Sequence, residues 1–352
     1  MSPLRLGRLS LRSSSLLAPL EGVSDVGFRA VCARLGAGLT FTEMVRADAL
    51  GRRNAASLAL IDSHDARTPT GVQLLASSAP QLLQALRVLE EAAMGPAPHL
   101  QNLVAVDLNF GCPSETVVRD GAGPALLKRR SRLREIFKAL VSFRDANCLG
   151  IVAVGAKLRL GLNRREAAGA HPVFIDAAAI AADEGLDWVT LHARHAGQRS
   201  SELPSWGAFA AARRALEGAG TGDARPRLIA NGNVRTETDR DALIASGAVD
   251  GVMLARAPMR NPWIFTDLLR GDDGASRDGV AGTACGPSVE WDDGGTWPTA
   301  QEVDEAASEW RTWAAVGAGS RPKHHAYHEA AWARLRGPAR GGVELPMNAH
   351  MT

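Results

Sequence analysis

Short hydrophobic runs alternate with longer stretches of helical periodicity from residue 15 to residue 270. Several runs are apolar at consecutive positions, as in strands whose two faces are both buried. Eight runs have this character, at residues 15–18, 39–42, 70–75, 103–108, 151–158, 187–191, 227–230 and 250–254. The pattern therefore predicts eight strands.

Helical patterns fill the intervals between these strands, for example at residues 79–93, 173–185, 205–216 and 236–247. Ser24 and Pro80 lie near predicted helix starts, and Gly185 and Gly247 lie near predicted helix ends. Strand–helix alternation repeated eight times is typical of a (β/α)8 TIM barrel, an α/β fold. A doubly wound open sheet is the alternative, because the number of strands does not prove that the sheet closes.

In such a barrel the active site lies at the carboxyl ends of the strands. Candidate site residues, most of them polar or small, stand at every one of these ends. They are Pro19, Leu20, Glu21, Glu43, Gln73, Asn109, Cys112, Lys157, Arg159, His192, Asn231, Gly232, Ala255 and Arg256. Each alone could be a satisfied strand-end group, but their coincidence at eight strands favours a functional site.

The chain has 352 residues and a formal net charge of +2, so its bulk charge does not indicate a nucleic-acid-binding protein. Binding to a polyanion would need a local basic face. Residues 128–134 are a candidate for such a face, although a solvated helix surface explains them equally well. Only four of the 40 basic residues are lysines, so Lys157, inside an apolar strand, stands out.

The four cysteines are Cys32, Cys112, Cys148 and Cys285, and their spacing fits no zinc pattern. We expect reduced thiols, no metal and a cytoplasmic protein. Residues 1–20 show no signal-peptide pattern, and no apolar stretch is long enough to span a membrane.

The last two strand ends carry the features of a phosphate site. Gly232 lets the backbone approach an anion closely, and Arg256 offers a bidentate guanidinium. These features favour a mononucleotide flavin, because the GxGxxG motif of a dinucleotide site does not follow the first strand. The Lys157 ammonium could stabilise a reduced flavin, and Gln73 could recognise the pyrimidine edge of the flavin ring. An ion pair with a carboxylate is the structural alternative for Lys157.

Cys112 lies in a Gly-Cys-Pro turn, which leaves little to bury its side chain. A thiol with an ordinary pKa of about 8.5 is mostly protonated at neutral pH and can donate a proton. Cys32 and Cys148 are expected to be buried free cysteines.

These segments together resemble one enzyme family, the tRNA-dihydrouridine synthases. The segments are APLEGVSDVGFR, TEMV, GVQLL, VDLNFGCPSETVVRDGAGPALLK, AKLRLG, LHAR, LIANGNV and DGVMLARAPMRNPWIF, in that order, from residue 16 to residue 267. The GCPS segment and the APLEG opening are most similar to the bacterial C-type branch.

The resemblance implies FMN as the cofactor, NADPH as the reductant and tRNA as the substrate, in a monomeric enzyme. It implies hydride transfer from flavin N5 to C6 of a uracil, and proton transfer from Cys112 to C5. It places Pro19, Leu20, Glu21, Gln73, Lys157 and His192 at the flavin ring. It places Asn231, Gly232, Asn233, Ala255 and Arg256 at the phosphate. Asn109 and Arg159 are expected near the uracil, which must leave its stack, and Arg194 and Arg199 against the tRNA.

Two residues depart from the family pattern. Ala255 stands where the family usually has glycine, so we expect its methyl group to weaken flavin binding. Glu115 stands where the branch commonly has lysine, which replaces a possible RNA contact with a repulsive charge.

The sequence predicts three parts: a flavin-binding catalytic barrel over 1–270, a linker or disordered loop over 271–298, and a small helical extension over 299–352 that would help to hold tRNA. Helical patterns in the extension cover 299–316 and 323–336. Its tryptophans could form a cluster, with Trp291, Trp297, Trp310, Trp313 and Trp332 as members.

Two other functions fit parts of the pattern. An FMN-dependent barrel oxidoreductase could act on a small pyrimidine such as dihydroorotate or dihydropyrimidine. A non-catalytic RNA-binding protein could have kept the fold.

Overall fold

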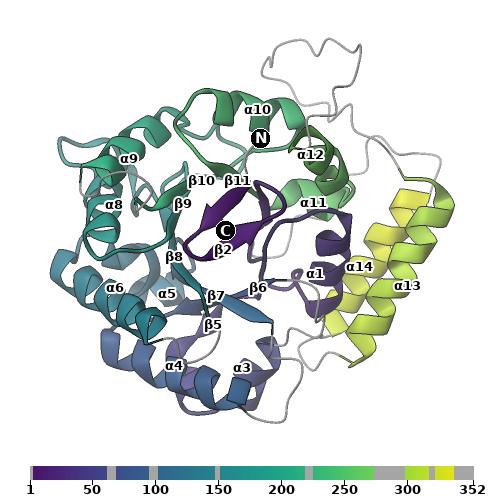
Figure 1. Ribbon diagram of the computed structural model, residues 1–352, viewed down its shortest axis with the longest axis horizontal. Coiled ribbons are helices and arrows are strands. Elements are labelled where there is room, and N and C mark those ends of the chain that lie inside the picture. The colour runs from purple at the N-terminus through teal and green to yellow at the C-terminus, as the bar shows by residue number, and fades with distance from the viewer. Residues whose placement is uncertain are drawn as a thin grey trace.

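The computed structural model describes residues 3–61, 69–94, 102–146, 151–218, 225–272, 298–316 and 322–336. Its centre is a ring of parallel strands, which Figure 1 shows surrounded by helices. The eight barrel strands are β3 (Ser15–Leu17), β4 (Thr40–Phe41), β6 (Thr70–Leu75), β7 (Leu103–Phe110), β8 (Ala153–Arg159), β9 (Trp188–His192), β10 (Arg227–Asn231) and β11 (Gly251–Leu254). All eight predicted strands are therefore confirmed.

The sheet closes on itself between its first and last members. The order along the sheet is β3-β11-β10-β9-β8-β7-β6-β4, and a short strand β5 (Val45–Arg46) also pairs with β6. The N–H of Leu17 donates to the carbonyl of Leu39 at 2.9 Å, and the N–H of Gly38 donates to the carbonyl of Ser15 at 2.9 Å. These bonds join β3 to the segment that enters β4. Closure confirms the (β/α)8 barrel and excludes the doubly wound sheet.

Helices surround the ring or lie in the loops that follow its strands. They are α1 (Val26–Leu35), α2 (Ala47–Gly51), α3 (Ala55–Leu60), α4 (Ala79–Met94), α5 (Glu115–Arg119), α6 (Arg130–Asp145), α7 (Arg164–Ala168), α8 (Val173–Asp183), α9 (Gly207–Glu217), α10 (Glu237–Ala245), α11 (Arg256–Arg260) and α12 (Ile264–Asp272). Gly185 and Gly247, just beyond α8 and α10, have φ of 81° and 70°, which glycine adopts readily at a helix end. The N-cap of α1 is Asp25, next to the predicted Ser24, and its side chain accepts from the N–H of Phe28.

Two hydrophobic cores lie on the two faces of the strands. Outward-facing residues pack against the helices, and inward-facing residues fill the barrel. The rings of Phe41 and Trp188 occupy the interior with centroids 6.2 Å apart. Glycines make room for them, because a Cβ on Gly71 would lie 2.5 Å from Phe41 and one on Gly155 would lie 2.1 Å from Trp188. Because these large apolar rings fill the interior, the polar site residues lie at the carboxyl ends of the strands.

An N-terminal hairpin that the sequence did not predict closes the amino end of the barrel. It consists of β1 (Leu4–Leu6) and β2 (Leu9–Leu11), which pair in antiparallel fashion. Leu6 and Leu11 are buried in the same cluster as the inward-facing barrel residues. Figure 1 shows the hairpin, in purple, across the centre of the ring.

Two further helices follow the barrel, α13 (Ala300–Val316) and α14 (Pro322–Arg336), where the sequence predicts helical patterns. Helix α13 packs against α1 and against α14. Trp310 and Trp332 are buried at 0% and 2% exposure, whereas Trp291 and Trp297 lie outside the described residues. Residues 273–297, most of the predicted linker, also lie outside them, as do residues 337–352, Cys148 and Cys285. The predicted division of the chain into three parts stays a prediction.

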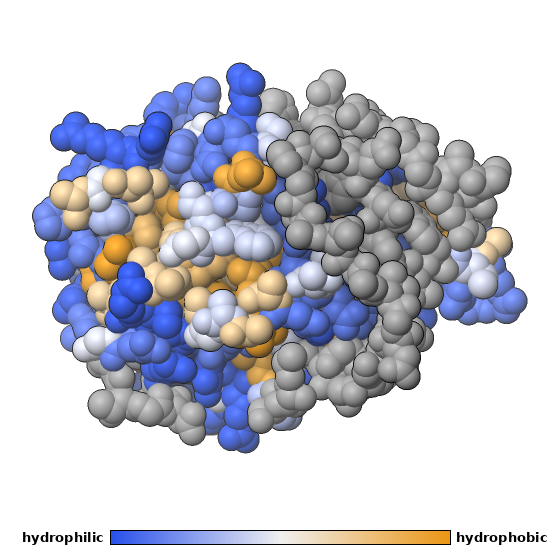
Figure 2. All heavy atoms as spheres, turned by 90° about the horizontal axis from the view of Figure 1, so that it is seen from above, coloured by the Kyte–Doolittle hydropathy of each residue, from blue (hydrophilic) through white to orange (hydrophobic). Residues whose placement is uncertain are grey.

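Three cations of the candidate basic face at residues 128–134 form ion pairs with acidic side chains. Arg130 lies 3.3 Å from Asp176 of α8, and Arg134 lies 2.9 Å from Asp183. Lys128 lies 3.7 Å from Glu166 of α7. In the coloured left part of Figure 2, hydrophobic residues gather in the middle and hydrophilic residues surround them. Within the described ranges, no helix is both long and apolar enough to cross a membrane.

Candidate active site

Neighbouring strands bring the predicted site residues to the same level of the barrel. The strand registers pair Gln73 with Asp107, Asn109 with Lys157, Arg159 with His192, and His192 with Asn231. Paired side chains on adjacent strands point to the same face of a sheet. The predicted residues of β6 to β10 therefore meet at the carboxyl end of the barrel.

A chain of buried amide hydrogen bonds organises this region. Gln73 Nε2 donates to Asp107 Oδ2 at 2.7 Å, and Asn109 Nδ2 donates to Gln73 Oε1 at 2.8 Å. Asn109 Oδ1 accepts from the N–H groups of Gly111 and Cys112 at 2.9 and 2.8 Å. Asn109 therefore holds the turn that carries the thiol. Its contact with a uracil stays a prediction, as does the contact between Gln73 and a flavin ring.

Asp107 is the residue that the sequence analysis missed. It is fully buried, and burial raises the pKa of its carboxyl to about 7, although the hydrogen bond from Gln73 and the charge of Lys157 act in the opposite direction. The signal was present in the strand pattern. Asp107 lies two positions before Asn109, so strand alternation places both on the inner face.

Lys157 lies at the end of β8, beside this carboxyl. Burial and the charge of Arg159 lower the pKa of Lys157 to about 8, while the charges of Asp107 and Cys112 raise it. The amine is therefore positively charged at neutral pH but loses its proton more easily than an ordinary lysine. Asp107 influences it through its charge, at longer range than a direct hydrogen bond.

The Cys112 thiol is half-buried in the loop after β7. Burial raises the pKa of the thiol, and the nearby charge of Glu21 also raises it, whereas a backbone hydrogen bond with Ser114 and the charges of Arg159 and Lys157 lower it. Cys112 and Lys157 lie on the same side of the molecule, because Asn109 is paired with Lys157 in the sheet and accepts from the N–H of Cys112. The thiol stays protonated at neutral pH.

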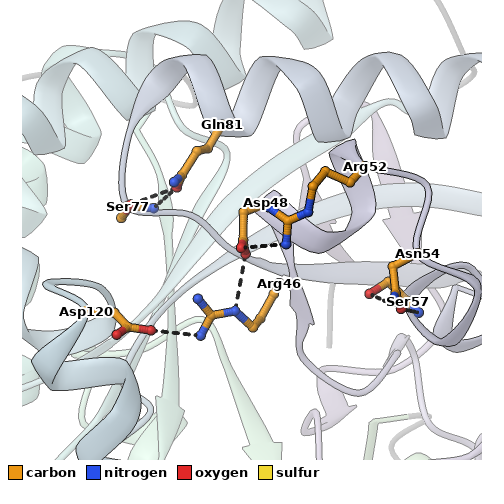
Figure 3. A network of polar contacts seen from close by, with 8 residues as sticks. All are labelled: Arg46, Asp48, Arg52, Asn54, Ser57, Ser77, Gln81 and Asp120. Carbon is orange, nitrogen blue, oxygen red and sulfur yellow. Dashed lines mark hydrogen bonds and ion pairs between the residues drawn. The ribbon is translucent and has the colours of Figure 1, made fainter.

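The loop after β7 carries Cys112 and is called the thiol loop below. Its far end is anchored to the end of strand β5. Asp120, which follows α5, accepts from Arg46 Nη1 at 3.1 Å, and Arg46 Nε donates to Asp48 at 3.2 Å. Figure 3 shows Arg46 between these two carboxylates, with Arg52 on the other side of Asp48. The loop is thus held by Asn109 near its start and by Arg46 near its end.

Arg159 and His192 occupy adjacent strand ends. Arg159 Nε donates to the carbonyl of Gly111 at 2.7 Å and its Nη1 to the carbonyl of His195 at 3.3 Å, so the guanidinium bridges two loops. Burial and then the charges of four cations hold the pKa of His192 well below its usual value. The imidazole is therefore neutral at pH 7. Its Nε2 must accept from Arg194 Nη1, 3.3 Å away, because a guanidinium only donates.

The ends of β10 and β11 have the geometry of an anion site. Gly232 has φ of 114°, and a Cβ there would lie 2.9 Å from His192. Asn233 has φ of 57°, and its Oδ1 accepts from both Arg194 Nη2 at 2.9 Å and Arg256 Nη2 at 2.5 Å. Asn231 Nδ2 donates to the carbonyl of Met253 at 2.7 Å, which ties the two strand ends together. The short helix α11 begins here, with Ala255 as its N-cap.

Like charges gather at this place. Burial and the charges of Arg256, Arg159 and Arg235 lower the pKa of Arg194 to about 10. Burial and the charge of Arg235 lower the pKa of Arg256. A cluster of guanidiniums that depress one another's pKa values would be relieved by a bound anion.

Arg194 differs from its predicted role. It is only 1% exposed, and its guanidinium donates to the carbonyls of Ser200 and Glu202 as well as to Asn233. The Arg194 guanidinium therefore stabilises the loop after β9. Because it is buried, it is not exposed for contact with RNA. Arg199 in the same loop is exposed.

The loop after β3 is a tight turn held from two sides. The N–H of Leu20 donates to Ser24 Oγ at 2.9 Å, and the N–H of Gly22 donates to Glu43 Oε2 at 2.7 Å. Pro19 and Leu20 are half-buried and Glu21 is exposed, near enough to Cys112 for its charge to act on the thiol.

Comparison with known proteins identifies similar sequences. The family model described as "Dihydrouridine synthase (Dus)" matches residues 16–280. A "tRNA-dihydrouridine synthase B" of Pseudomonas putida is 30% identical over 269 residues, which cover 76% of this chain and 71% of that protein. A "Probable tRNA-dihydrouridine synthase" of Mycobacterium tuberculosis is 31% identical over 272 residues, which cover 75% of this chain and 64% of that protein. The similarity to the C-type branch stays a prediction.

Solved structures with a similar fold have much lower sequence identity. Morphinone reductase in complex with tetrahydroNAD matches 78% of this chain and 90% of its own, with a TM-score of 0.50 at 16% identity. A 2-naphthoyl-CoA reductase complex matches 76% of this chain and 52% of its own, with a TM-score of 0.53 at 12% identity. These likenesses support the barrel fold.

Proposed function

Because this chain belongs to the dihydrouridine synthase family, we propose that it uses FMN and NADPH to reduce the C5–C6 double bond of a uridine in tRNA. The observation that carries the proposal is that Asn109, paired with Lys157 across the sheet, accepts from the N–H of Cys112, so a thiol and an amine lie together at the carboxyl end of one barrel. An acid and a cation so placed suit the addition of a proton and a hydride to the two ends of a polarised double bond.

The residues present fit a flavin mononucleotide. Its phosphate would take the place where Arg194 and Arg256 converge on Asn233, at the start of α11. Gly232 has no side chain to cover its backbone, so an anion can approach that backbone closely. Phosphate oxygens would relieve the repulsion among the guanidiniums. Asn231 and Ala255 complete this part of the site.

The flavin ring would lie between the loop after β3 and the residues of β6 to β9. Pro19, Leu20 and Glu21 would contact it from one side, with Gln73 and His192 from the other. The Lys157 ammonium would hydrogen-bond the ring and stabilise the negative charge of its reduced form. Asp107 would keep Lys157 cationic by its charge, and it would also orient Gln73.

Bound in this way, reduced FMN would supply the hydride that C6 of the uracil accepts. Cys112 would give its thiol proton to C5. Burial keeps the thiol protonated before the step, and the charges of Arg159 and Lys157 stabilise the thiolate left after it. Arg159 also fixes the Gly111 carbonyl, so the same side chain sets the thiol loop and the charge around it.

A uracil in folded tRNA must leave its stack to reach this place. Phosphate and shape contacts would hold the tRNA, with exposed arginines such as Arg199 in contact with its backbone.

The test uses purified protein reconstituted with FMN and supplied with NADPH and unmodified tRNA. The expected results are tRNA-dependent oxidation of NADPH and dihydrouridine in the tRNA, detected by nucleoside mass spectrometry. In parallel reactions, orotate or free uracil, the unsaturated counterparts of dihydroorotate and dihydropyrimidine, takes the place of the tRNA. Turnover of these small pyrimidines without turnover of tRNA would overturn the proposal in favour of a small-molecule oxidoreductase. A colourless protein that binds RNA but not FMN would exclude both enzymes.

A further inference from the structure

Two neighbouring residues of the C-terminal helix α14 contact two separate loops of the barrel. His328 Nε2 lies 2.9 Å from the carbonyl oxygen of Val23, in the loop after β3. Tyr327 Oη donates to the carbonyl oxygen of Met259, in α11, at 3.3 Å. Val23 follows Leu20 by three residues, and Met259 follows Arg256 by three residues. Each contacted carbonyl is therefore close in the chain to a residue that we propose binds FMN.

The contact at Val23 is made inside a buried cluster of aromatic rings. His328 is 1% exposed, and its ring centroid lies 4.9 Å from that of Phe28 and 5.1 Å from that of Trp310. Because a carbonyl only accepts, His328 Nε2 carries the hydrogen of this bond. In the same cluster Trp310 Nε1 donates to Asp25 Oδ2 at 3.4 Å. Asp25 caps α1 two residues after Val23, so α13 and α14 hold the same end of the loop.

A second contact of α14, made by Trp332, lies close to the bond between Tyr327 and Met259. Trp332, one turn after His328, packs edge-on against Trp263 with ring centroids 6.5 Å apart. Trp263 follows α11 by three residues and is 7% exposed. In Figure 1, α13 and α14, in yellow, lie beside α1. One face of α14 thus spans the loop after β3 and the helix after β11.

We propose that α14 acts as a clamp on the flavin site, in which His328 and Tyr327 are positioning residues that fix the ring-binding and phosphate-binding loops relative to each other. This rests on the proposed function, because it assumes that FMN spans those two loops. The ring and the phosphate of FMN lie at opposite ends of the molecule, so each must meet its own binding loop at the same time. A helix that holds both loops in advance lowers the entropy lost on binding, so the C-terminal extension contributes to cofactor affinity as well as to any RNA contact.

The test is titration of FMN into the full-length protein stripped of flavin, followed by quenching of flavin fluorescence and by the FMN release rate. Tyr327→Phe removes a single hydroxyl, and His328→Leu removes the donor to Val23. Each is expected to raise the Kd of FMN roughly threefold to tenfold, as expected for one lost positioning hydrogen bond. His328→Gln keeps an N–H donor at a similar place and should restore most of the affinity.

Leu335→Ala provides the matched control, because Leu335 is also buried in α14, at 4% exposure. This variant should lower the melting temperature while leaving the Kd of FMN unchanged. An equal rise in Kd for Leu335→Ala and His328→Leu would overturn the clamp, since loosening of the extension would then explain both. Wild-type affinity in both Tyr327→Phe and His328→Leu would overturn it as well. A wild-type protein that binds no FMN would instead overturn the proposed function, and the clamp with it.

Discussion

The replacement Asp107→Asn tests whether the buried carboxyl beside Lys157 stays protonated in the folded protein at pH values where it is ionised in the unfolded chain. In the unfolded chain an aspartate has a pKa of about 3.9. In the folded protein burial raises the pKa of Asp107 to about 7. Because this folded-state pKa is raised, the folded state binds the proton more tightly, and the protein loses stability as the pH rises from the lower value to the higher one. Asparagine cannot ionise, so the variant lacks this loss.

The size of the effect follows from the two pKa values. One pKa unit corresponds to 1.36 kcal/mol, so complete ionisation of Asp107 in the folded state destabilises the protein by roughly 4 kcal/mol. Between pH 5 and pH 7 the accumulated difference is roughly 2 kcal/mol, since the folded carboxyl is only half ionised at the upper end. Any pH-independent effect of the substitution, such as an altered contact with Gln73 or Trp188, is the same at both pH values and cancels.

Urea unfolding at pH 5 and pH 7, followed by the fluorescence of the tryptophans, measures this difference. We expect Asp107→Asn to gain roughly 2 kcal/mol relative to wild type on going from pH 5 to pH 7. Asp48→Asn is the control. Burial raises the pKa of Asp48, but Arg46 and Arg52 outweigh it and lower the pKa overall, so this carboxyl is ionised throughout that range. Its stability difference from wild type should stay constant. A constant difference for Asp107→Asn as well would refute the reasoning, because the carboxyl would then be ionised in both states.

Substitutions at four further positions test the site. Cys112→Ala should bind FMN and be reduced by NADPH normally, while reduction of uridine in tRNA slows by roughly 10²- to 10⁴-fold in single-turnover assays; an unchanged rate would remove the thiol from the mechanism. Lys157→Ala should weaken FMN binding or slow its reduction by NADPH, and Lys157→Arg should keep more of both because it retains the charge; stopped-flow spectra that match wild type for the alanine variant would count against this role. Ala255→Gly should tighten FMN binding in a fluorescence titration by removing a methyl group next to the phosphate, and weaker binding would show that the alanine backbone suits the site. Asn109→Ala should slow uridine reduction because the N–H groups of the thiol loop lose their acceptor, whereas Asn109→Asp keeps that acceptor and should retain more activity; equal rates in the two variants would contradict the account of the loop.

The sequence determined the elements of the barrel and most of the strand-end chemistry. Strands buried on both faces need consecutive apolar residues, so eight such runs were visible without any knowledge of tertiary structure. Glycines such as Gly185 and Gly247 marked helix ends because few other residues adopt a positive φ. Strand polarity then placed residues such as Asn109 and Lys157 at one end of a barrel. The family followed from the order of the motifs, which the family match confirms.

Only the tertiary structure decided which of these groups are charged, buried or engaged with one another. Closure of the ring depends on hydrogen bonds between Leu17 and Leu39 and between Gly38 and Ser15, which no local pattern encodes. The raised pKa of Asp107 is a desolvation effect, set by the surrounding elements. The burial of Arg194 beneath its own loop has the same origin. The bond between His328 and Val23 joins residues far apart in the chain. Local sequence sets backbone preference and burial period, whereas desolvation and long-range contacts depend on which distant segments the folded chain brings together.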